Sequence, residues 1–547
     1  MSPPSRLSRL DRALAFGLVL ATAGLMWATN KPIGHVRDEG YYFTAAHDYE
    51  SWFRELGRDF AHGQVARPFQ DWTIVHDWSY NQEHPPLAKE SFALSHLLFT
   101  RTLGWLDGET AYRLPAFLFA GLLSLALFLL ALPWGRAAAL LAPALFWAVP
   151  RHFFHGHIAC FDIPVAAMWC LFLVGYAHWL RTGRGAWTAG LLFGLLLATK
   201  HNALLMPPAI LAHWLVTNRK DLWAAGFKGL LIRIPKPFVT MAIAGPAVLY
   251  VLWPFLWHHP IDRVASWIRF HLHHVNYPWE YFGKELRAPP FPHLYPLGVE
   301  AVTLPVATLL LLGFASIKLF AQGAGSFSRA LRARAGALDR VDWLLFFSIL
   351  VAIVPFMVGS TPIFGGIKHW MAGIAVLGVF GARLAVDAAG ALLPSHRRLA
   401  TVGLATCVLV PGAISTAHFQ PYGTSAYNEL AGGAAGGAML GMQRQFWSNN
   451  VTAVLPWLNQ HAPRGALVFF HEVNFESFSA YQREGALRKD IRYAWSPEDA
   501  TIAVYQYMRE FRDREFEIWT EFGTRVPALS FGIDQATQIV VYVRRRW

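Results

Sequence analysis

The sequence predicts a polytopic α-helical membrane protein with a small α/β domain at its C-terminal end. Of its 547 residues, 54% are hydrophobic and only 15% are charged, and the mean hydropathy is +0.31. Soluble chains of this length carry more charge. Many windows of about 18 to 22 residues are almost wholly apolar, which is the length that a bilayer-spanning helix requires. A helix also satisfies its own backbone polar groups in lipid, whereas an open sheet edge does not.

The apolar windows recur along the first three quarters of the chain. Residues 117–132, 299–317 and 343–358 are examples, and residues 86–103 are also apolar enough to cross. We expect about 11 to 13 crossings. Whether residues 86–103 cross determines whether this number is odd or even.

Basic residues between the windows predict the topology. Arg6, Arg9 and Arg12 precede the first apolar run at 14–29, which has no clear cleavage site behind it and is expected to stay as an anchor. The positive-inside rule places these arginines and the later basic clusters in the cytoplasm, so the net charge of +12 indicates no nucleic-acid partner. The stretches left outside are 30–112, 156–162, 200–202, 254–296, 359–369 and the chain after about 416.

The chain after the last apolar window changes character. "GALVFFHEV" at 465–473 and "TQIVVYVRR" at 537–545 have the composition of β-strands bounded by turn residues. We therefore predict a membrane domain at 1–415, with a first external loop at 30–85, and an extracytoplasmic α/β domain at 416–547. The cysteines form no CxxC motif, so neither a zinc ribbon nor a disulfide framework is expected.

Two adjacent acids follow the first apolar run. Asp38 and Glu39 in "VRDEGYY" precede "YYFTAAHDYESWFREL", where apolar residues recur as in a helix that lies on the membrane surface. Asp38 suits the N-cap of that helix. It also suits a catalytic carboxylate at the membrane boundary, where it would meet a substrate that keeps its lipid in the bilayer and its polar head in water.

Other acids stand beside prolines. Glu83 and His84 directly precede the proline pair of "EHPPLAKE", and Asp162 opens the apolar segment "FDIPVAAMW". Each position suits an ordinary helix start, because proline begins helices and aspartate caps them. The predicted topology nevertheless places all of them on the same outer side as Asp38.

Cations accompany these acids. Lys200 in "LLLATKHNALLMPP" and Lys368 in "GGIKHWM" both fall outside, against the positive-inside bias. An outward ammonium at a helix end suits a phosphate partner, so we predict that Lys200 and Lys368 bind a phosphate. For Lys200, a lysine that merely snorkels to the interface is the alternative.

The external stretch 254–296 is dense in histidine, aromatic and proline residues. His271 and His274 share a helix face at i, i+3 spacing, which suits a metal, a phosphate or simply a polar face. Tyr281 could stack on a sugar ring, although aromatic residues are also common at membrane interfaces. Together the acids, cations and aromatics suit a reaction in which a base takes a hydroxyl proton, cations hold a leaving phosphate and aromatics seat a sugar.

The motifs also carry a resemblance. The order of "RDEGYY", "EHPPLAKE", "FDIP", "TKHNALL", "YPWEYFGKELRAPPFPHLYP" and "GGIKHWM" resembles the GT-C membrane glycosyltransferases. Within these it is most similar to bacterial relatives of protein O-mannosyltransferases and lipid A aminoarabinose transferases. The resemblance covers residues 1 to about 420 and depends on the order and spacing of short motifs.

The resemblance implies a GT-C fold and the transfer of a sugar from a polyprenyl-phosphate donor to a hydroxyl acceptor. It implies a single inverting displacement on the extracytoplasmic face of a bacterial inner membrane. Asp38 matches the acid of the first external loop, the catalytic base or acceptor-orienting carboxylate, and Glu39 is its neighbour. Asp162 matches the acid of the second loop, and Lys200 matches a lysine that faces the donor phosphate.

The other matches concern the substrate-binding loops. Glu83 matches the acid before the proline pair. His84 stands where some aminoarabinose transferases have a lysine, which implies that it binds the donor phosphate together with Lys200 and Lys368. His274 roughly matches a histidine of the later external loop. No metal is expected to be required, with a divalent metal at Glu83, His271 or His274 as the alternative.

The sugar stays open, and so does the choice among lipid, glycan and protein acceptors. A transporter or flippase of lipid-linked sugars is the alternative function. Such proteins usually have paired inverted repeats, and the sequence has no such internal symmetry. A metal-dependent oligosaccharyl or lipid hydrolase is the third alternative and would lose activity with a chelator.

Overall fold

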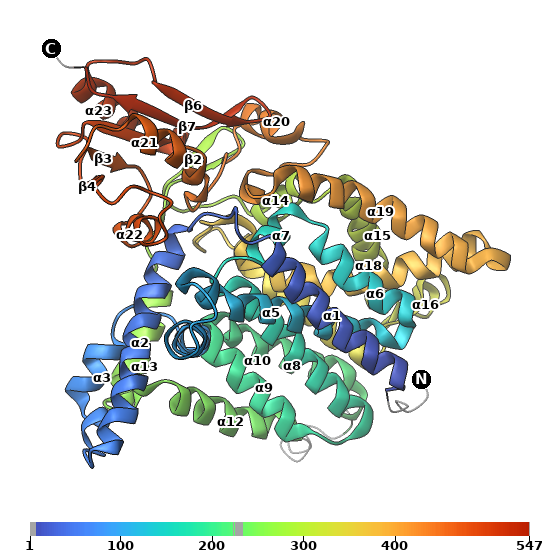
Figure 1. The fold of residues 1–547 in the computed structure, drawn as a ribbon. Helices are drawn as coiled ribbons and strands as arrows, with labels where there is room; N and C mark the ends of the chain where they lie inside the picture. Colours follow the sequence, from blue (N-terminus) through green and yellow to red (C-terminus); the bar gives the residue numbers. More distant parts are fainter. Residues whose placement is uncertain (1–6, 223, 225–233, 546–547) are drawn as a thin grey trace.

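The computed structural model describes residues 7–222, 224 and 234–545 (Figure 1). Packed helices form the body of the protein, and the C-terminal strands lie together beyond one end of this body. Arg6, one of the arginines expected before the first span, lies outside the described residues. Arg9 is the first residue of helix α1 (Arg9–Ala28).

The fold is that of a polytopic α-helical membrane protein, as predicted. Within the described residues, 7 helical segments are long and apolar enough to cross a membrane. They comprise α1, α5 (Gly108–Ala131), α8 (Asp162–Thr182), α15 (Val306–Gly325), α17 (Arg340–Ile353), α18 (Met371–Leu392) and α19 (Arg397–Phe419). Shorter apolar helices are α6 (Arg136–Trp147), α9 (Ala186–Thr199) and α12 (Lys236–Leu252). Within the described residues, the predicted total of about 11 to 13 crossings is reached only if other short helices, such as α10 (Met206–Thr217), cross as well.

Residues 86–103 do not form one long span. Helix α4 (Leu87–His96) is followed by a π-helical segment, Leu97–Thr102, and α4 packs against α2 (Arg37–Ala61) and α5. His96 and Arg101 approach the carboxylate of Glu50 at 2.5 and 3.4 Å. The segment therefore makes polar contacts within the protein that its apolar composition does not predict.

The apolar window predicted at 299–317 is divided between two helices. Helix α14 (Tyr295–Thr303) ends before Pro305, which is the N-cap of α15. Proline disfavours helical geometry in the residue before it and has no N–H of its own. The side-chain amide of Asn428 donates to the carbonyl oxygens of Ala301 and Leu304 at 2.8 Å, which satisfies acceptors freed by the break.

The long helix α2 and several short elements cover the end of the body at which the predicted external loops meet. The short elements include α3 (Asp71–Trp78), α7 (Pro150–His155), α13 (Pro260–Leu272) and the antiparallel hairpin of β1 (Trp279–Tyr281) and β2 (Lys284–Leu286). Helix α2 contains the amphipathic stretch that the sequence predicts after Glu39, and Figure 1 shows it along one edge of the molecule with α3 and α13.

The C-terminal part contains a mixed sheet with the strand order β4-β3-β5-β7-β6. Its strands are β3 (Leu467–Phe470), β4 (Arg492–Ala494), β5 (Ile502–Gln506), β6 (Leu529–Ile533) and β7 (Ala536–Val543). Strands β3, β4 and β5 run parallel, whereas β7 is antiparallel to β5 and β6. The helices of this part are α20 (Gly433–Met439), α21 (Leu455–His461), α22 (Phe475–Arg483) and α23 (Arg512–Phe522). The strands predicted at 465–473 and 537–545 are β3 and β7.

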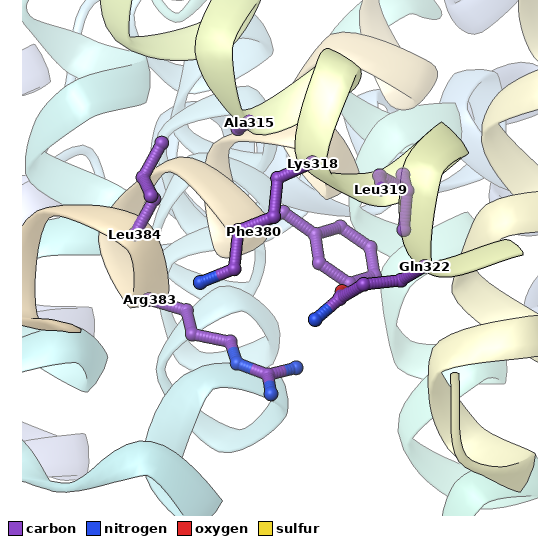
Figure 2. A pocket seen from close by; sticks show the side chains of 7 residues that line it. All are labelled: Ala315, Lys318, Leu319, Gln322, Phe380, Arg383 and Leu384. Carbon is purple, nitrogen blue, oxygen red and sulfur yellow. The ribbon is translucent and has the colours of Figure 1, made fainter. Parts of the chain in front are cut away.

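Charged side chains also occur within the helical body, at the ends of α15 and α18 that lie away from this sheet. Lys318 of α15 and Arg383 of α18 point into one small pocket between these helices (Figure 2). Lys318 pairs with Asp387 at 3.2 Å, and Arg383 pairs with Asp342 of α17 at 3.3 Å. Such pairing is how ionisable groups are tolerated inside membrane proteins.

Candidate active site

At the start of α2, the two predicted acids Asp38 and Glu39 have different surroundings. Val36 is the N-cap, and the carboxylate of Glu39 accepts from the Val36 backbone N–H at 3.1 Å. Asp38 is therefore not the N-cap that its position in the sequence suggests. Its carboxylate is 20% exposed and lies 3.5 Å from the ammonium of Lys368. This contact joins the first external loop to a loop more than three hundred residues later.

Glu39 is enclosed. Its carboxylate accepts two hydrogen bonds from the Arg113 guanidinium, both at 2.7 Å, and one from the Ala159 backbone N–H at 2.8 Å. Burial alone would raise the pKa of Glu39, but Arg113 and these hydrogen bonds lower it below its usual value. The side chain has 0% exposure. The structure therefore separates Glu39 from the other acids predicted to be catalytic.

Asp162 and Lys200 form the second acid–cation pair. Asp162 is the first residue of α8, and Lys200 follows the last residue of α9. The ammonium of Lys200 donates to one Asp162 oxygen at 3.1 Å, and Nδ1 of His155 lies 3.3 Å from the other. Both members of the pair are buried. Such a buried pair is stable only while both partners keep their charge.

Lys368 lies in a tight turn between aromatic rings. Gly365 and Gly366, which precede it, have φ values of +75° and +58°, a region that favours glycine. The Lys368 ammonium lies 5.0 Å from the ring centre of Phe364 and 4.9 Å from that of Trp447. Because Trp447 follows the last membrane helix, the segment after α19 completes this part of the site.

Tyr42 indicates that the two acid–cation pairs share one region. Its hydroxyl is buried, and its ring packs on Phe161, which precedes Asp162, with centres 4.1 Å apart. Burial raises the pKa of Tyr42 well above its usual value, and the negative charges of Asp38, Asp162 and Glu83 raise it further. Acids from three separate segments therefore act on one side chain.

Three histidines form a cluster beside these pairs. The ligand atoms of His84, His201 and His271 lie within 4.8 Å of one another. Nε2 of His271 donates to the Glu83 carbonyl oxygen at 2.9 Å, and its ring stacks on that of His201 at 3.7 Å. Among the described residues, Nδ1 of His84 and of His201 has no hydrogen-bond partner. The cluster could therefore bind a metal ion or a phosphate.

Burial lowers the pKa of each histidine in the cluster, to about 4 for His271 and well below the usual value for His84 and His201. For His84, the positive charges of Lys89 and Lys200 lower the pKa further. The cluster is therefore neutral at physiological pH and lies in positive surroundings.

The remaining predicted residues are placed differently. The carboxylate of Glu83 accepts from the Asn81 side-chain amide at 2.7 Å. His274 is half-buried and stacks on Phe364 at 4.8 Å, which brings it to the edge of the Lys368 turn. Tyr281 packs against Tyr295 of α14 at 5.0 Å, so the described structure does not bring it to the charged residues.

Sequence reasoning missed several residues of the site. His201 directly follows Lys200 in "TKHNALL", and His155 lies seven residues before Asp162. Both histidines are therefore close in the sequence to residues that the motifs identify. Arg113 and Trp447 were missed for different reasons. An arginine at the start of an apolar span is unusual and was a signal that could have been used, whereas a tryptophan after the last span is common. Only the folded contacts identify their partners.

Comparison with known proteins gives one match to a protein family. The model of the family described as dolichyl-phosphate-mannose-protein mannosyltransferase matches residues 83–258. This segment contains Glu83, His84, Asp162 and Lys200. Over these residues the chain is similar to that mannosyltransferase family. Its apolar helices make it an integral membrane protein.

Solved structures are similar to this chain over nearly its full length. One is ArnT from Cupriavidus metallidurans bound to undecaprenyl phosphate, with 13% identity, coverage of 97% of this chain and 98% of ArnT, and a TM-score of 0.49. Another is the Archaeoglobus fulgidus oligosaccharyltransferase tethered with an acceptor peptide, with 11% identity, coverage of 98% and 74%, and a TM-score of 0.47. No curated protein matches the sequence.

Proposed function

We propose that this protein transfers a sugar from a polyprenyl-phosphate donor to a hydroxyl acceptor by a single inverting displacement. Asp38 accepts the proton of the acceptor hydroxyl, whose oxygen attacks the anomeric carbon while the bond to the phosphate oxygen breaks. Lys200 and Lys368 stabilise the negative charge of the leaving polyprenyl phosphate. The similarity of residues 83–258 to the dolichyl-phosphate-mannose-protein mannosyltransferase family supports a polyprenyl-phosphate donor.

The proposal depends on one observation, the two acid–cation pairs around Tyr42. A carboxylate and an ammonium 3.5 Å apart at Asp38 and Lys368 offer a base beside a phosphate ligand. The pair of Asp162 and Lys200, at 3.1 Å, offers a second ammonium held in place by a buried acid. A donor phosphate entering between them would replace carboxylate oxygens as the partner of the lysines, which would leave Asp38 free to accept a proton.

Glu39 has a different role in this proposal. Its oxygens are occupied by Arg113, Ala159 and Val36. We assign it to positioning, because it fixes the first turn of α2 and therefore the direction of the neighbouring Asp38.

We place the site on the outer face of a bacterial inner membrane. Helix α8 begins at Asp162 and has Arg181 in its last turn, so these residues lie about 30 Å apart along the helix axis. Arg340 begins α17, and Arg397 begins α19, whereas Lys368 lies just before α18. The basic helix ends therefore lie opposite to the site, and the positive-inside rule supports an outward-facing site.

We further propose that the transfer requires no metal ion. The imidazoles of His84, His201 and His271 could ligate one, but Lys89 and Lys200 make their surroundings positive. Such surroundings favour a phosphate oxygen over a divalent cation. The transfer rate should be unchanged after treatment with EDTA, and a loss that zinc or manganese restores would contradict this.

Replacement of the proposed base tests the function. Reconstituted Asp38→Asn protein should transfer sugar from an undecaprenyl-phosphate-linked donor at least about 100-fold more slowly, because the general base is lost. Asp71→Asn is the matched control, since the Asp71 carboxylate is 44% exposed and pairs with Arg263 away from the cluster. Transfer by Asp38→Asn at the wild-type rate would exclude Asp38 as the base.

A further inference from the structure

Three aromatic side chains of the C-terminal part form an open surface, which we call the aromatic shelf. It consists of Phe475 at the start of α22, Tyr493 of β4 and Trp495 just after β4. Trp495 is 74% exposed and Phe475 is 45% exposed. The rings of Phe475 and Trp495 are stacked with centres 5.7 Å apart, and Tyr493 meets Trp495 edge-on at 4.9 Å.

The exposure of the shelf is not needed for the fold. The sheet already buries apolar side chains on both faces, for example Val468 on one face and Phe469 on the other. Leaving a large indole in water loses the hydrophobic stabilisation that its burial would provide. A cluster of exposed aromatic rings is typical of a binding surface.

Polar groups border the shelf. Tyr41, on α2, lies near the side chain of Asn474, and Tyr80 lies near that of Glu476. Asn474 and Glu476 stand on either side of Phe475 in the chain. Open aromatic faces thus lie beside hydroxyl, amide and carboxylate groups that can exchange hydrogen bonds with a ligand.

The shelf is attached to the beginning of α2, next to Asp38. The amide of Asn474 donates to the carbonyl oxygen of Arg37 at 3.0 Å, and the guanidinium of Arg37 pairs with Glu472. Gly40 permits the close approach, because a Cβ there would lie 2.7 Å from the Asn474 side chain. In Figure 1, α22 lies directly beside the end of α2. Tyr41 is one helical turn after Asp38.

We propose that the aromatic shelf binds a sugar ring of the acceptor, so that the acceptor is a glycan or a glycolipid. Sugar C–H faces pack on aromatic rings, and sugar hydroxyls hydrogen-bond to groups such as Glu476 and Asn474. The carboxylate of Glu476 disfavours the anionic headgroups of a membrane surface. This inference rests on the proposed function only in naming the bound sugar as the acceptor.

Saturation-transfer NMR on the full-length protein in detergent tests the proposal. The probes are the methyl glycosides of glucose, galactose, mannose, N-acetylglucosamine and arabinose, each at millimolar concentration. At least one glycoside should receive saturation at its ring protons. Trp495→Ala should abolish that transfer, whereas Trp495→Tyr, which keeps an aromatic ring, should retain most of it.

Two variants separate this inference from its alternatives. Phe516→Ala removes an aromatic ring of α23 that is 61% exposed and should leave the saturation signal unchanged. Asp38→Asn should keep the signal while losing sugar transfer, so the failure of one proposal is distinguishable from the failure of the other. If no glycoside gives a signal that Trp495→Ala removes, the shelf is a contact for protein or membrane and the inference is overturned.

Discussion

Asp38 and Glu39 are adjacent in the chain, but substitutions at the two positions should have different effects on stability and on sugar transfer. Glu39→Gln removes the carboxylate that accepts two hydrogen bonds from the buried Arg113, which then keeps only Glu109 as a charged partner among the described residues. Breaking a buried ion pair in this way costs about 3 to 5 kcal/mol. We expect Glu39→Gln to lower the unfolding temperature in detergent, and Asp38→Asn to leave it nearly unchanged.

A normal unfolding temperature for Glu39→Gln, combined with lost transfer, would contradict the positioning role and return Glu39 to the reacting groups. The sequence identifies both acids but not this difference. Arg113 is 74 residues from Glu39 in the chain and stands in an apolar window, so no local pattern connects them.

The histidine cluster predicts a dependence of stability on pH. His271 has a folded-state pKa of about 4, against an ordinary value of 6.5. As the pH falls below 6.5, the unfolded chain takes up protons that the folded cluster does not, so the free energy of unfolding decreases. Stability should therefore be full above pH 6.5 and should fall between about pH 6.5 and 4.

Thermal unfolding at pH 7.5 and at pH 5 measures this effect. His271→Gln should weaken the pH dependence, because glutamine keeps a donor for the Glu83 carbonyl but does not titrate. An equal slope in wild type and His271→Gln would show that His271 does not contribute.

At the scale of an element, α2 offers two glycines with different surroundings. A Cβ at Gly40 would lie 2.7 Å from Asn474, whereas a Cβ at Gly57 would have nothing within 4 Å. Gly40→Ala should therefore push α22 away from α2 and cost about 1 to 3 kcal/mol. Gly57→Ala, the control, should stabilise the helix by about 0.5 to 1 kcal/mol.

Limited proteolysis after residue 416 reports the separation of α22 from α2. We expect faster cleavage in Gly40→Ala and unchanged or slower cleavage in Gly57→Ala. Equal rates in the two variants would show that the contact between Gly40 and Asn474 does not hold the C-terminal part in place.

The elements also show where sequence patterns are informative. The amphipathic stretch after Glu39 and the strands β3 and β7 are predictable, because periodicity and β-branched composition act locally. The window at 299–317 is misjudged because hydropathy does not register the break at Pro305. The sequence leaves the crossing of 86–103 open, because the contacts of this segment with Glu50 come from α2. Local sequence patterns thus predict that a helix or strand exists, whereas contacts with residues distant in the chain determine where it begins and ends.

At the scale of the whole molecule, the site is assembled from segments that only the fold brings together. Asp38 comes from the first loop, Asp162 and Lys200 from helix ends, Lys368 from a late turn and Trp447 from beyond the last membrane helix. The sequence indicates that the acids and lysines share one side of the membrane, because basic clusters fix the orientation. It does not indicate which acid pairs with which lysine.

That orientation leads to a prediction about the intact membrane. Helix α15 has 20 residues and connects the outer segments to α16 (Arg329–Ala335), about 30 Å away. Lys284 in β2 and Arg334 in α16 are both exposed. In intact bacterial cells, a membrane-impermeant maleimide should label Lys284→Cys at once and Arg334→Cys only after permeabilisation.

Native cysteines provide the background for this experiment. Cys160 and Cys170 are buried, and Cys407 is exposed on α19, within a membrane-spanning segment. Wild-type protein should therefore label weakly before permeabilisation. Labelling of Arg334→Cys in intact cells would invert the topology, and Asp38, Lys200 and Lys368 would then face the cytoplasm, where an acceptor outside the cell could not reach them.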